Sequence, residues 1–256
     1  MEESDPPRTI HAVEKASEII RTLAREGTMG VTDLSSELDI SKGTIHTHLA
    51  TLVQEGYIVK QENEYALSLR FLGLAEHVKD RLEIYDMVQE EIDALAEKTS
   101  ERAQYAVMES NKTVFVYRAE GENAVRASVG IGEYEYPHCT AVGKAMLAYL
   151  PNHRLESVIE EHGLPRRTEN TISNATDLKN ELDTVREREF AIDNEERARG
   201  IRCIATPLRD DVGRLLGGIS ISGPARRLTD ERIENDLKDD LLRSANVIEV
   251  NSGLDT

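Results

Sequence analysis

The stretch Ser-Lys-Gly-Thr-Ile-His-Thr-His-Leu-Ala-Thr-Leu, residues 41–52, decides the fold of the N-terminal part of the chain. Ile45 and Leu49 are separated by about one helical turn, so their side chains share one face of a helix. Ser41 is a favourable N-cap, and Gly56 is typical of a helix C-terminus. The pattern predicts a helix that begins at Ser41, buries one apolar face and presents a polar face to solvent.

The segments before this helix also have a helical period. Apolar residues recur from Ile10 to Leu23, and we expect Gly27 to end the first helix. A second, short helix is expected to have Thr32 as its N-cap, and residues 39–40 form the turn that follows it. Two helices separated by about three residues are typical of a helix-turn-helix.

A hairpin is predicted directly after the third helix. Residues 57–60 and 65–67 are rich in β-forming side chains, and the polar residues 61–64 between them form a turn. Three helices followed by a hairpin indicate a winged helix-turn-helix domain, which we expect to cover residues 1–70.

The polar face of the third helix is the candidate DNA-binding surface. Its Lys, His and Thr side chains are suited to contacts with phosphates and base edges. Glu55 is the only acidic residue between Ser41 and Lys60, which favours phosphate binding there. For His46 and His48 the alternative is that they are ordinary solvated helix residues. The predicted contacts with double-stranded operator DNA are Arg8, Ser41, Lys42, Thr44, His46, Thr47, His48 and Lys60.

The overall charge is unfavourable for general nucleic-acid binding. The chain has 31 Lys and Arg against 48 Asp and Glu, a net charge of −17. In concentrated salt the Debye length falls to about 3 Å at 1 M, so distant charges stop repelling phosphates. We therefore interpret the composition as adaptation to a salt-rich cytosol, such as that of a haloarchaeon. The alternative is an acidic protein that binds no DNA.

Cysteine content and hydropathy predict a cytoplasmic protein. Cys139 and Cys203 are the only cysteines, which suits a reducing compartment, and we predict no disulfide. The N-terminus lacks the pattern of a signal peptide, and no apolar run is long enough to cross a bilayer. We expect no membrane partner.

Two further helices are predicted to link the domains over residues 71–99. Apolar residues keep helical spacing from Phe71 to Leu82 and again from Ile84 to Leu95. A single winged helix reads only a few base pairs, so we expect a homodimer, or a tetramer formed as a dimer of dimers. The stripe that begins at Phe71 either serves this pairing or packs inside one chain.

The remaining residues, 100–256, are expected to form an α+β domain with a mainly antiparallel sheet and flanking helices. Its predicted strands are residues 102–109, 112–119, 124–129, 190–193, 202–209 and 215–222. Its predicted helices are residues 141–149, 152–161, 175–189 and 229–250.

Three collinear stretches, within residues 8–250, resemble the IclR family of transcriptional regulators. They are the helix at 42–52, the stretch Tyr136–Ala148, which has a proline, small residues and then Gly-Lys-Ala, and Phe190–Cys203 followed by Ile219–Pro224. The resemblance implies a GAF-like α/β effector-binding domain behind the winged helix-turn-helix. It also implies operator binding controlled by a small metabolite, expected to be an organic acid, sugar-derived or aromatic.

The resemblance also implies a pocket between the sheet and the loop that opens the helix at 141–149. Backbone amides at that helix start favour a carboxylate, and Ser220 and Ser222 would face the same side of a strand. Alternatively, Cys203 is simply a small buried residue, and the two serines satisfy backbone groups. The predicted effector contacts are Thr140, Ala141, Val142, Gly143, Asp193, Ile201, Cys203, Ser220 and Ser222.

The recognition helix departs from the family pattern at Gly43 and Thr47, where relatives usually carry Ser and Arg. These changes remove a phosphate or base contact, so the operator sequence cannot be transferred from the family. Gly43 also lowers helix stability by up to about 1 kcal/mol relative to Ala.

Other functions have weaker support in the sequence. Residues 141–144 lack the full glycine-rich pattern of a phosphate loop. Cys139 and the adjacent His138 would point to opposite faces of a strand, which disfavours a thiol nucleophile. A zinc site formed by these two residues with Cys203 and Asp193 lacks close ligand spacing. We therefore predict no enzyme activity, no catalytic residue, no cofactor and no metal; a ligand-independent DNA-binding protein remains the alternative.

Overall fold

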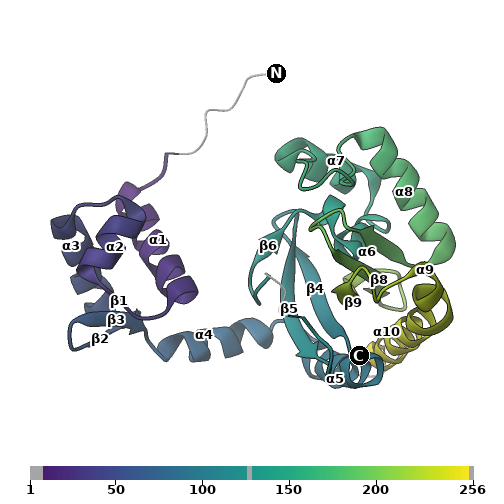
Figure 1. Ribbon diagram of the computed structural model, residues 1–256, viewed down its shortest axis with the longest axis horizontal. Helices are drawn as coiled ribbons and strands as arrows, with labels where there is room; N and C mark the ends of the chain where they lie inside the picture. The colour runs from purple at the N-terminus through teal and green to yellow at the C-terminus, as the bar shows by residue number, and fades with distance from the viewer. Residues whose placement is uncertain (1–7, 126–128, 254–256) are drawn as a thin grey trace. The chain divides into compact units, whose positions relative to one another are not determined.

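A computed structural model describes residues 8–125 and 129–253 of the chain. The chain divides between Glu83 and Ile84 into two compact units, each with its own core (Figure 1). No helix among the described residues is both long and apolar enough to span a membrane.

The first unit is a winged helix-turn-helix, as expected. Its helices are α1 (His11–Glu26), α2 (Val31–Leu38) and α3 (Lys42–Gln54). Its antiparallel sheet has the order β1 (Met29–Gly30), β3 (Glu64–Leu67) and β2 (Ile58–Gln61). Ile19, Leu34 and Ile45, one from each helix, are fully buried against Ile58 of β2. These contacts fix α3 on the body of the unit and leave its opposite face free.

Local signals set most helix ends in this unit. The Ser41 side chain caps α3 by accepting a hydrogen bond from the Thr44 amide at 3.2 Å. Gly27 follows α1 with φ +85°, a left-handed conformation that favours glycine. The prediction of Thr32 as an N-cap is wrong, because Val31 is already helical and Gly30 occupies the cap position.

The expected linker divides between the two units. Helix α4 (Arg70–Lys79) belongs to the first unit and has no buried residue. Helix α5 (Tyr85–Thr99) belongs to the second, where Val88 and Ile92 are fully buried in the core. Residues 84–99 are therefore part of the C-terminal core, and only α4 and the short segment after it lie outside that core.

The second unit is built on a six-stranded antiparallel sheet. The order across the sheet is β6-β5-β4-β9-β8-β7, so strands from both ends of the domain meet at its centre. The strands are β4 (Arg102–Glu109), β5 (Lys112–Glu120), β6 (Tyr134–Glu135), β7 (Ala191–Asn194), β8 (Ile201–Arg209) and β9 (Leu215–Pro224).

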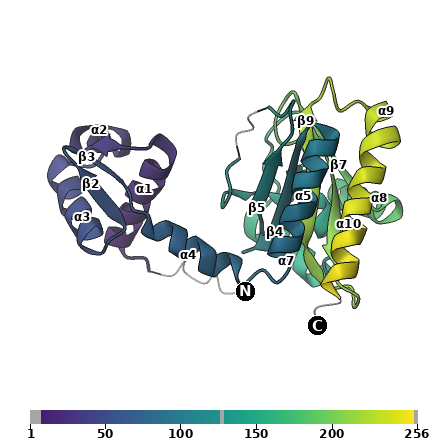
Figure 2. The same cartoon turned by 90° about the horizontal axis from the view of Figure 1, so that it is seen from below.

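Helices cover both faces of this sheet. Helix α5 and the C-terminal α10 (Lys238–Ser252) lie side by side on one face, where they bury Ile219 and Ile221 of β9 (Figure 2). A second core lies on the other face. It is formed with α6 (Ala141–Leu147), α7 (Asn152–His162) and α8 (Ala175–Arg188).

Sequence and structure differ at a few elements of this domain. The helix expected at 229–250 is present as one unbroken run, in which α9 (Asp230–Arg232) and the π-helical turn η2 (Ile233–Leu237) lead directly into α10; the π-helical turn was not expected. Of the strand expected at 124–129, residues 126–128 lie outside the described residues, and the others are not in a strand. β6 was not expected. The predicted α+β class with a mainly antiparallel sheet is confirmed.

Candidate functional site

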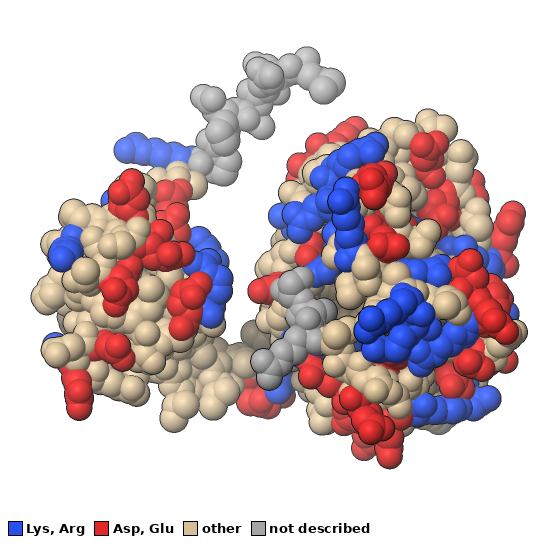
Figure 3. Space-filling model, viewed as in Figure 1, with Lys and Arg blue, Asp and Glu red and all other residues tan. Residues whose placement is uncertain are grey.

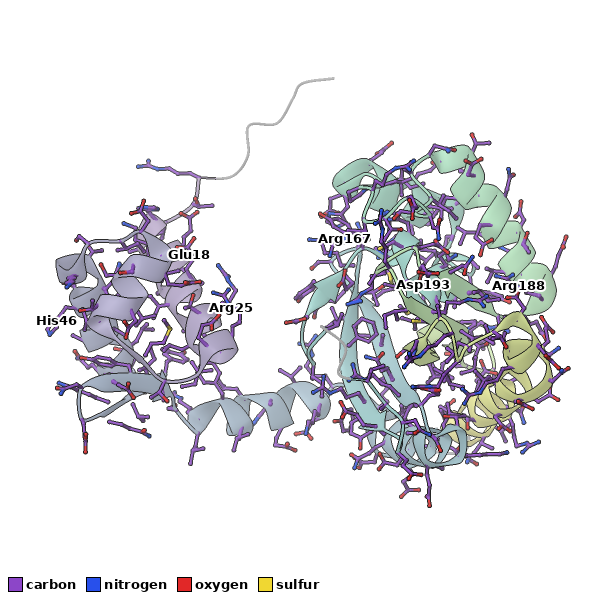
Figure 4. All side chains as sticks on the ribbon, viewed as in Figure 1. Glu18, Arg25, His46, Arg167, Arg188 and Asp193 are labelled. Atoms are coloured by element: carbon purple, nitrogen blue, oxygen red, sulfur yellow. The ribbon has the colours of Figure 1, made fainter. Side chains whose placement is uncertain are left out.

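The first candidate surface is the exposed face of α3. Lys42, His46 and Thr47 are exposed, whereas Ile45 and Leu49 on the opposite face are fully buried. Figure 4 shows His46 at the outer surface of the unit. This face therefore offers a cation and neutral polar groups on a rigid helix, a combination suited to phosphates and base edges.

Two predicted contacts on α3 are less accessible than expected. Thr44 and His48 are only half-exposed, and Thr44 Oγ1 lies 2.8 Å from Ser41 Oγ. Both hydroxyls therefore take part in capping α3. This arrangement fixes the start of the helix, and a contact of Ser41 or Thr44 with DNA stays a prediction.

The remaining predicted DNA contacts lie outside α3. Lys60 is exposed on β2, with its Nζ 5.9 Å from the centroid of the Tyr65 ring. Arg8 is exposed in the segment that precedes α1. The exposed acids Glu62 and Glu64 lie in the same hairpin as Lys60, so the wing presents charges of both signs.

The second candidate site is a pocket between the sheet of the second unit and the start of α6. The empty space within it totals about 410 Å³ when the open solvent at its mouth is included. Every effector contact expected from the sequence lines it except Gly143. The lining residues are Gln104, Phe115, Val129, Thr140, Ala141, Val142, Asp193, Arg197, Ile201, Cys203, Ser220 and Ser222.

The floor of the pocket consists of strands in register. Asp193 on β7 pairs with Cys203 on β8, which pairs with Ser222 on β9. Ser220 pairs with Gln104 on β4 in the next row on the same face. Strand pairing thus brings side chains from the consecutive strands β7, β8 and β9 together with Gln104 of β4, which is far from them in the sequence.

The start of α6 forms a wall of the pocket. Thr140 Oγ1 accepts a hydrogen bond from the Gly143 amide at 3.1 Å, so this amide serves the helix cap. A Cβ on Gly143 would collide with the carbonyl oxygen of Pro137. Gly143 is therefore required for close packing beneath the pocket, whereas Ala141 and Val142 line it directly.

Asp193 is the buried acid of the pocket (Figure 4). Its side chain is 1% exposed, and Oδ1 accepts hydrogen bonds from the amides of Glu196 at 2.7 Å and Arg197 at 3.3 Å. Burial raises the pKa of Asp193 to about 7, and the charge of Glu196 adds to this rise. Near neutral pH this carboxyl can therefore accept a proton from a bound ligand or donate one to it.

Lys144 forms an ion-pair cluster behind this wall. Its Nζ lies 2.5 Å from Glu196 Oε1 and 3.1 Å from Glu181 Oε1. Lys144 is 1% exposed and Glu196 is 5% exposed, so this pair joins α6 to the segment after β7 inside the protein.

Four pocket residues were not predicted: Gln104, Phe115, Val129 and Arg197. Gln104 had a usable signal, because it is a polar residue in the middle of the expected strand 102–109 and period-two alternation fixes its face. For Phe115 and Val129 nothing in the local pattern separates pocket lining from ordinary core.

Cys139 is a buried free thiol, and Cys203 is a half-buried free thiol on β8. Burial raises the pKa of the Cys139 thiol to about 12, so the thiol stays protonated at neutral pH and is a poor nucleophile. His138 Nε2 lies 3.1 Å from the Pro165 carbonyl oxygen. Within residues 8–125 and 129–253, no three His, Cys, Asp or Glu side chains are arranged to hold a metal ion.

Both units match known protein families. Residues 12–62 match the IclR helix-turn-helix domain, and residues 76–250 match the domain described as bacterial transcriptional regulator IclR C-terminal. The probable HTH-type transcriptional regulator ArcR of Halobacterium salinarum is 32% identical over 249 residues, which cover 95% of this chain and 94% of that protein. The HTH-type transcriptional regulator KdgR of Escherichia coli is 29% identical over 89% of this chain and 88% of its own length.

Solved structures agree with these matches. The crystal structure of the Thermotoga maritima IclR protein superposes with a TM-score of 0.81 and 28% sequence identity, covering 96% of this chain and all of that one. Family, sequence and fold thus agree over both units. The chain belongs to the IclR family of transcriptional regulators, which bind DNA through an N-terminal helix-turn-helix.

Proposed function

We propose that this regulator binds operator DNA through α3 and that a small organic effector, held in the pocket of the second unit, controls this binding. The observation that carries the proposal is the pocket floor. Gln104, Asp193, Ser220 and Ser222 converge from three strands on a space within an otherwise apolar core. Convergent polar groups in an apolar cavity are typical of a ligand site.

The exposed face of α3 supplies the proposed DNA contacts. Lys42 lies in the first turn of α3 and binds phosphate, while His46 and Thr47, one turn further on, reach base edges. The Thr47 hydroxyl also donates to the Gly43 carbonyl oxygen at 3.0 Å, which holds the side chain in place for a methyl or hydroxyl contact. Arg8 and Lys60 are proposed to bind the flanking backbone.

We further propose that the protein works in concentrated salt, in a haloarchaeal cytoplasm. The net charge is −17, and acidic side chains are spread over the visible face of both units (Figure 3). At molar salt these distant charges are screened, and short-range contacts of α3 dominate. The similarity to a Halobacterium salinarum regulator supports this assignment.

Pairing of two chains through α4 completes the proposal. Leu69, Leu72 and Val78 are 82%, 65% and 56% exposed, so this surface is apolar and uncovered within the first unit. Phe71 is different, because its ring lies 5.9 Å from that of Tyr57 and packs inside the chain. We propose that a second copy covers the exposed α4 residues and places two winged helices on a two-fold symmetric site, in a homodimer or a dimer of dimers.

The residues that line the pocket bear on the chemical class of the effector. Phe115, Val129 and Ile201 provide apolar contacts, while the serines and Asp193 provide hydrogen bonds. This mixture is compatible with the proposed effector class, a small organic acid that is sugar-derived or aromatic.

Selection of bound duplexes from a random-sequence library tests the DNA-binding proposal. At molar potassium chloride, we expect the purified protein to enrich one two-fold symmetric sequence, and a metabolite panel to contain a compound that changes its affinity. Enrichment of no sequence would contradict operator binding. Enrichment that no compound alters, together with an unchanged melting temperature, would favour a ligand-independent regulator.

A further inference from the structure

Arg70, the first residue of α4, joins this helix to the end of the recognition helix α3. Its Nη1 donates to the carbonyl oxygen of Glu55 at 2.7 Å, and Glu55 is the C-cap of α3. The last carbonyls of a helix lack intrahelical partners and carry the negative end of the helix dipole, so a guanidinium suits this position. A charge-assisted hydrogen bond therefore connects the end of α3 with the start of α4.

Neighbouring contacts hold the same junction. The Arg70 guanidinium lies over the Tyr57 ring, 5.4 Å from its centroid, and the Phe71 ring lies 5.9 Å from that of Tyr57. The Ser68 hydroxyl donates to the Gly56 carbonyl oxygen at 2.6 Å, and the Ser68 amide donates to the Tyr57 carbonyl oxygen at 3.0 Å. Three consecutive carbonyls at the end of α3 thus bind the segment that begins α4.

The rest of α4 has little packing of its own within the first unit. Every residue from Leu72 to Val78 is exposed, and α4 has no buried residue. The helix extends away from the body of the first unit (Figure 2). The direction of α4 relative to α3 is therefore fixed mainly at its first turn, by Arg70 and Phe71.

A small change of direction at this turn has a large effect at the far end of α4. The helix has 10 residues, so it is about 15 Å long at about 1.5 Å per residue. A rotation of about 20° at its start moves its far end by about 5 Å, which exceeds the rise of about 3.4 Å per base pair of DNA. The contacts of Arg70 thus bear on distances that matter for operator geometry.

We propose that Arg70 is a positioning residue for operator recognition. By fixing the direction of α4 relative to α3, Arg70 sets the separation of the two recognition helices in a dimer, and thereby the spacing of the half-sites that the dimer accepts. The inference rests on the proposed pairing of two chains through α4. Recognition helices related by a two-fold axis bind half-sites whose separation matches that of the helices, so a looser junction tolerates more spacings.

Duplexes that differ only in half-site spacing test the proposal on the full-length protein. Two copies of the half-site of the selected operator form inverted repeats whose spacer changes by one base pair at a time over one helical turn. Binding is followed by fluorescence anisotropy at molar potassium chloride. We expect the wild type to prefer one spacing by about tenfold or more over its neighbours, and Arg70→Met to reduce this preference to about threefold or less. Affinity for a duplex with a single half-site should stay within about twofold of the wild type.

Two further variants separate the position of the charge from the charge itself. Arg81→Met removes the same charge from an exposed position beyond the end of α4, and it should keep the wild-type spacing preference. Arg70→Lys keeps the charge but loses the planar group that lies over Tyr57, so its preference should fall between those of the wild type and Arg70→Met. Sedimentation velocity should show the wild-type assembly for all three variants.

The possible failures are distinguishable. If Arg70→Met keeps the wild-type spacing preference, the positioning role of Arg70 is wrong while pairing through α4 stands. If Arg70→Met weakens binding to every duplex alike, including the single half-site, Arg70 is a phosphate contact and the proposal is overturned. A monomeric Arg70→Met would overturn it as well, because Arg70 would then be needed for pairing itself. If the wild type binds all spacings alike, both this inference and the pairing proposal are contradicted.

Discussion

The ammonium group of Lys144 lies 2.5 Å from Glu196 Oε1, in a pair whose members are 1% and 5% exposed. Lys144 projects from α6, and Glu196 follows β7 directly after the buried Asp193. The pair therefore ties together two segments that border the pocket. Because Glu196 is buried, its charge depends on Lys144, whereas Lys144 also contacts the partly exposed Glu181 at 3.1 Å.

Loss of the Lys144 charge is expected to destabilise the second unit strongly. Lys144→Met leaves Glu196 buried without its cation, and removing one member of a buried pair typically costs about 3–5 kcal/mol. The free energy of unfolding, measured by denaturant titration, is expected to fall by that order. Lys179→Met is the control, because Lys179 is 53% exposed and lies 3.9 Å from the exposed Glu156. A change in Lys144→Met no larger than in the control would contradict the prediction.

Asp193 is expected to make stability depend on pH. Burial raises its pKa to about 7, whereas an unfolded chain releases this proton near about pH 4. The folded state therefore holds a proton that the unfolded state has lost. The contribution of this group is fully present below about pH 4 and is lost as the pH rises to about 7, with a slope of at most about 1.4 kcal/mol per pH unit.

The variant Asp193→Asn should remove that slope and be more stable than the wild type above pH 7, because no buried charge forms. Urea titrations between pH 4 and pH 8 measure the effect. Asp211→Asn, at an exposed position, is expected to keep the wild-type profile. The prediction is wrong if Asp193→Asn and the wild type share one profile.

Local sequence patterns predicted most helices and strands of this protein, for identifiable reasons. The strand expected at 102–109 matches β4 because its residues are bounded by polar turns, and Ser41 begins α3 because its hydroxyl binds the Thr44 amide. Strands β1 and β6 were not predicted from the sequence, because each has only two residues, too few to show a strand period. They exist because the neighbouring strands β3 and β5 offer hydrogen-bonding edges.

The pocket could be foreseen only in part. The residues placed by the family resemblance line the pocket, with the exception of Gly143. The contacts of the buried charged residues around the pocket could not be predicted from local spacing. Lys144 and Glu196 are 52 residues apart in the sequence. Arg102 looks like an ordinary strand residue until strand pairing sets it beside Ser222. Long-range register, which no local pattern carries, creates both relationships.

Substituting alanine for Gly43 and for Gly143 is expected to change the stability of the protein in opposite directions. A Cβ on Gly43 meets nothing within 4 Å, and the residue lies in the first turn of α3, so Gly43→Ala should raise the free energy of unfolding by up to about 1 kcal/mol. A Cβ on Gly143 meets Pro137 and Thr140, so Gly143→Ala should lower stability and weaken effector binding. Equal effects on stability would contradict this contrast.

The exposed face of α4 is expected to control self-association. Leu72→Glu places a charge on a side chain that is 65% exposed in the isolated chain, so it should shift the protein toward monomers without unfolding the first unit. Sedimentation velocity measures the change. Val212→Glu, at an 82% exposed position in the second unit, is the control and should leave the assembly unchanged. A dimer that survives Leu72→Glu would place the pairing surface elsewhere.

Lys42 and His46 are expected to contribute differently to DNA binding, although both are exposed on α3. Lys42→Ala removes a phosphate contact, so affinity should fall alike for the selected operator and for random duplex, and the dependence of log affinity on log salt should weaken by about one contact. His46→Ala should instead reduce the preference for the selected sequence by about 1–3 kcal/mol, because His46 is proposed to contact base edges. Thr44→Val is expected to change base preference less than His46→Ala, since the Thr44 hydroxyl already contacts Ser41 Oγ at 2.8 Å.

Fluorescence anisotropy titrations of both duplexes over a range of potassium chloride concentrations separate these effects. Equal losses on both duplexes for all three variants would remove α3 as the element that reads the sequence.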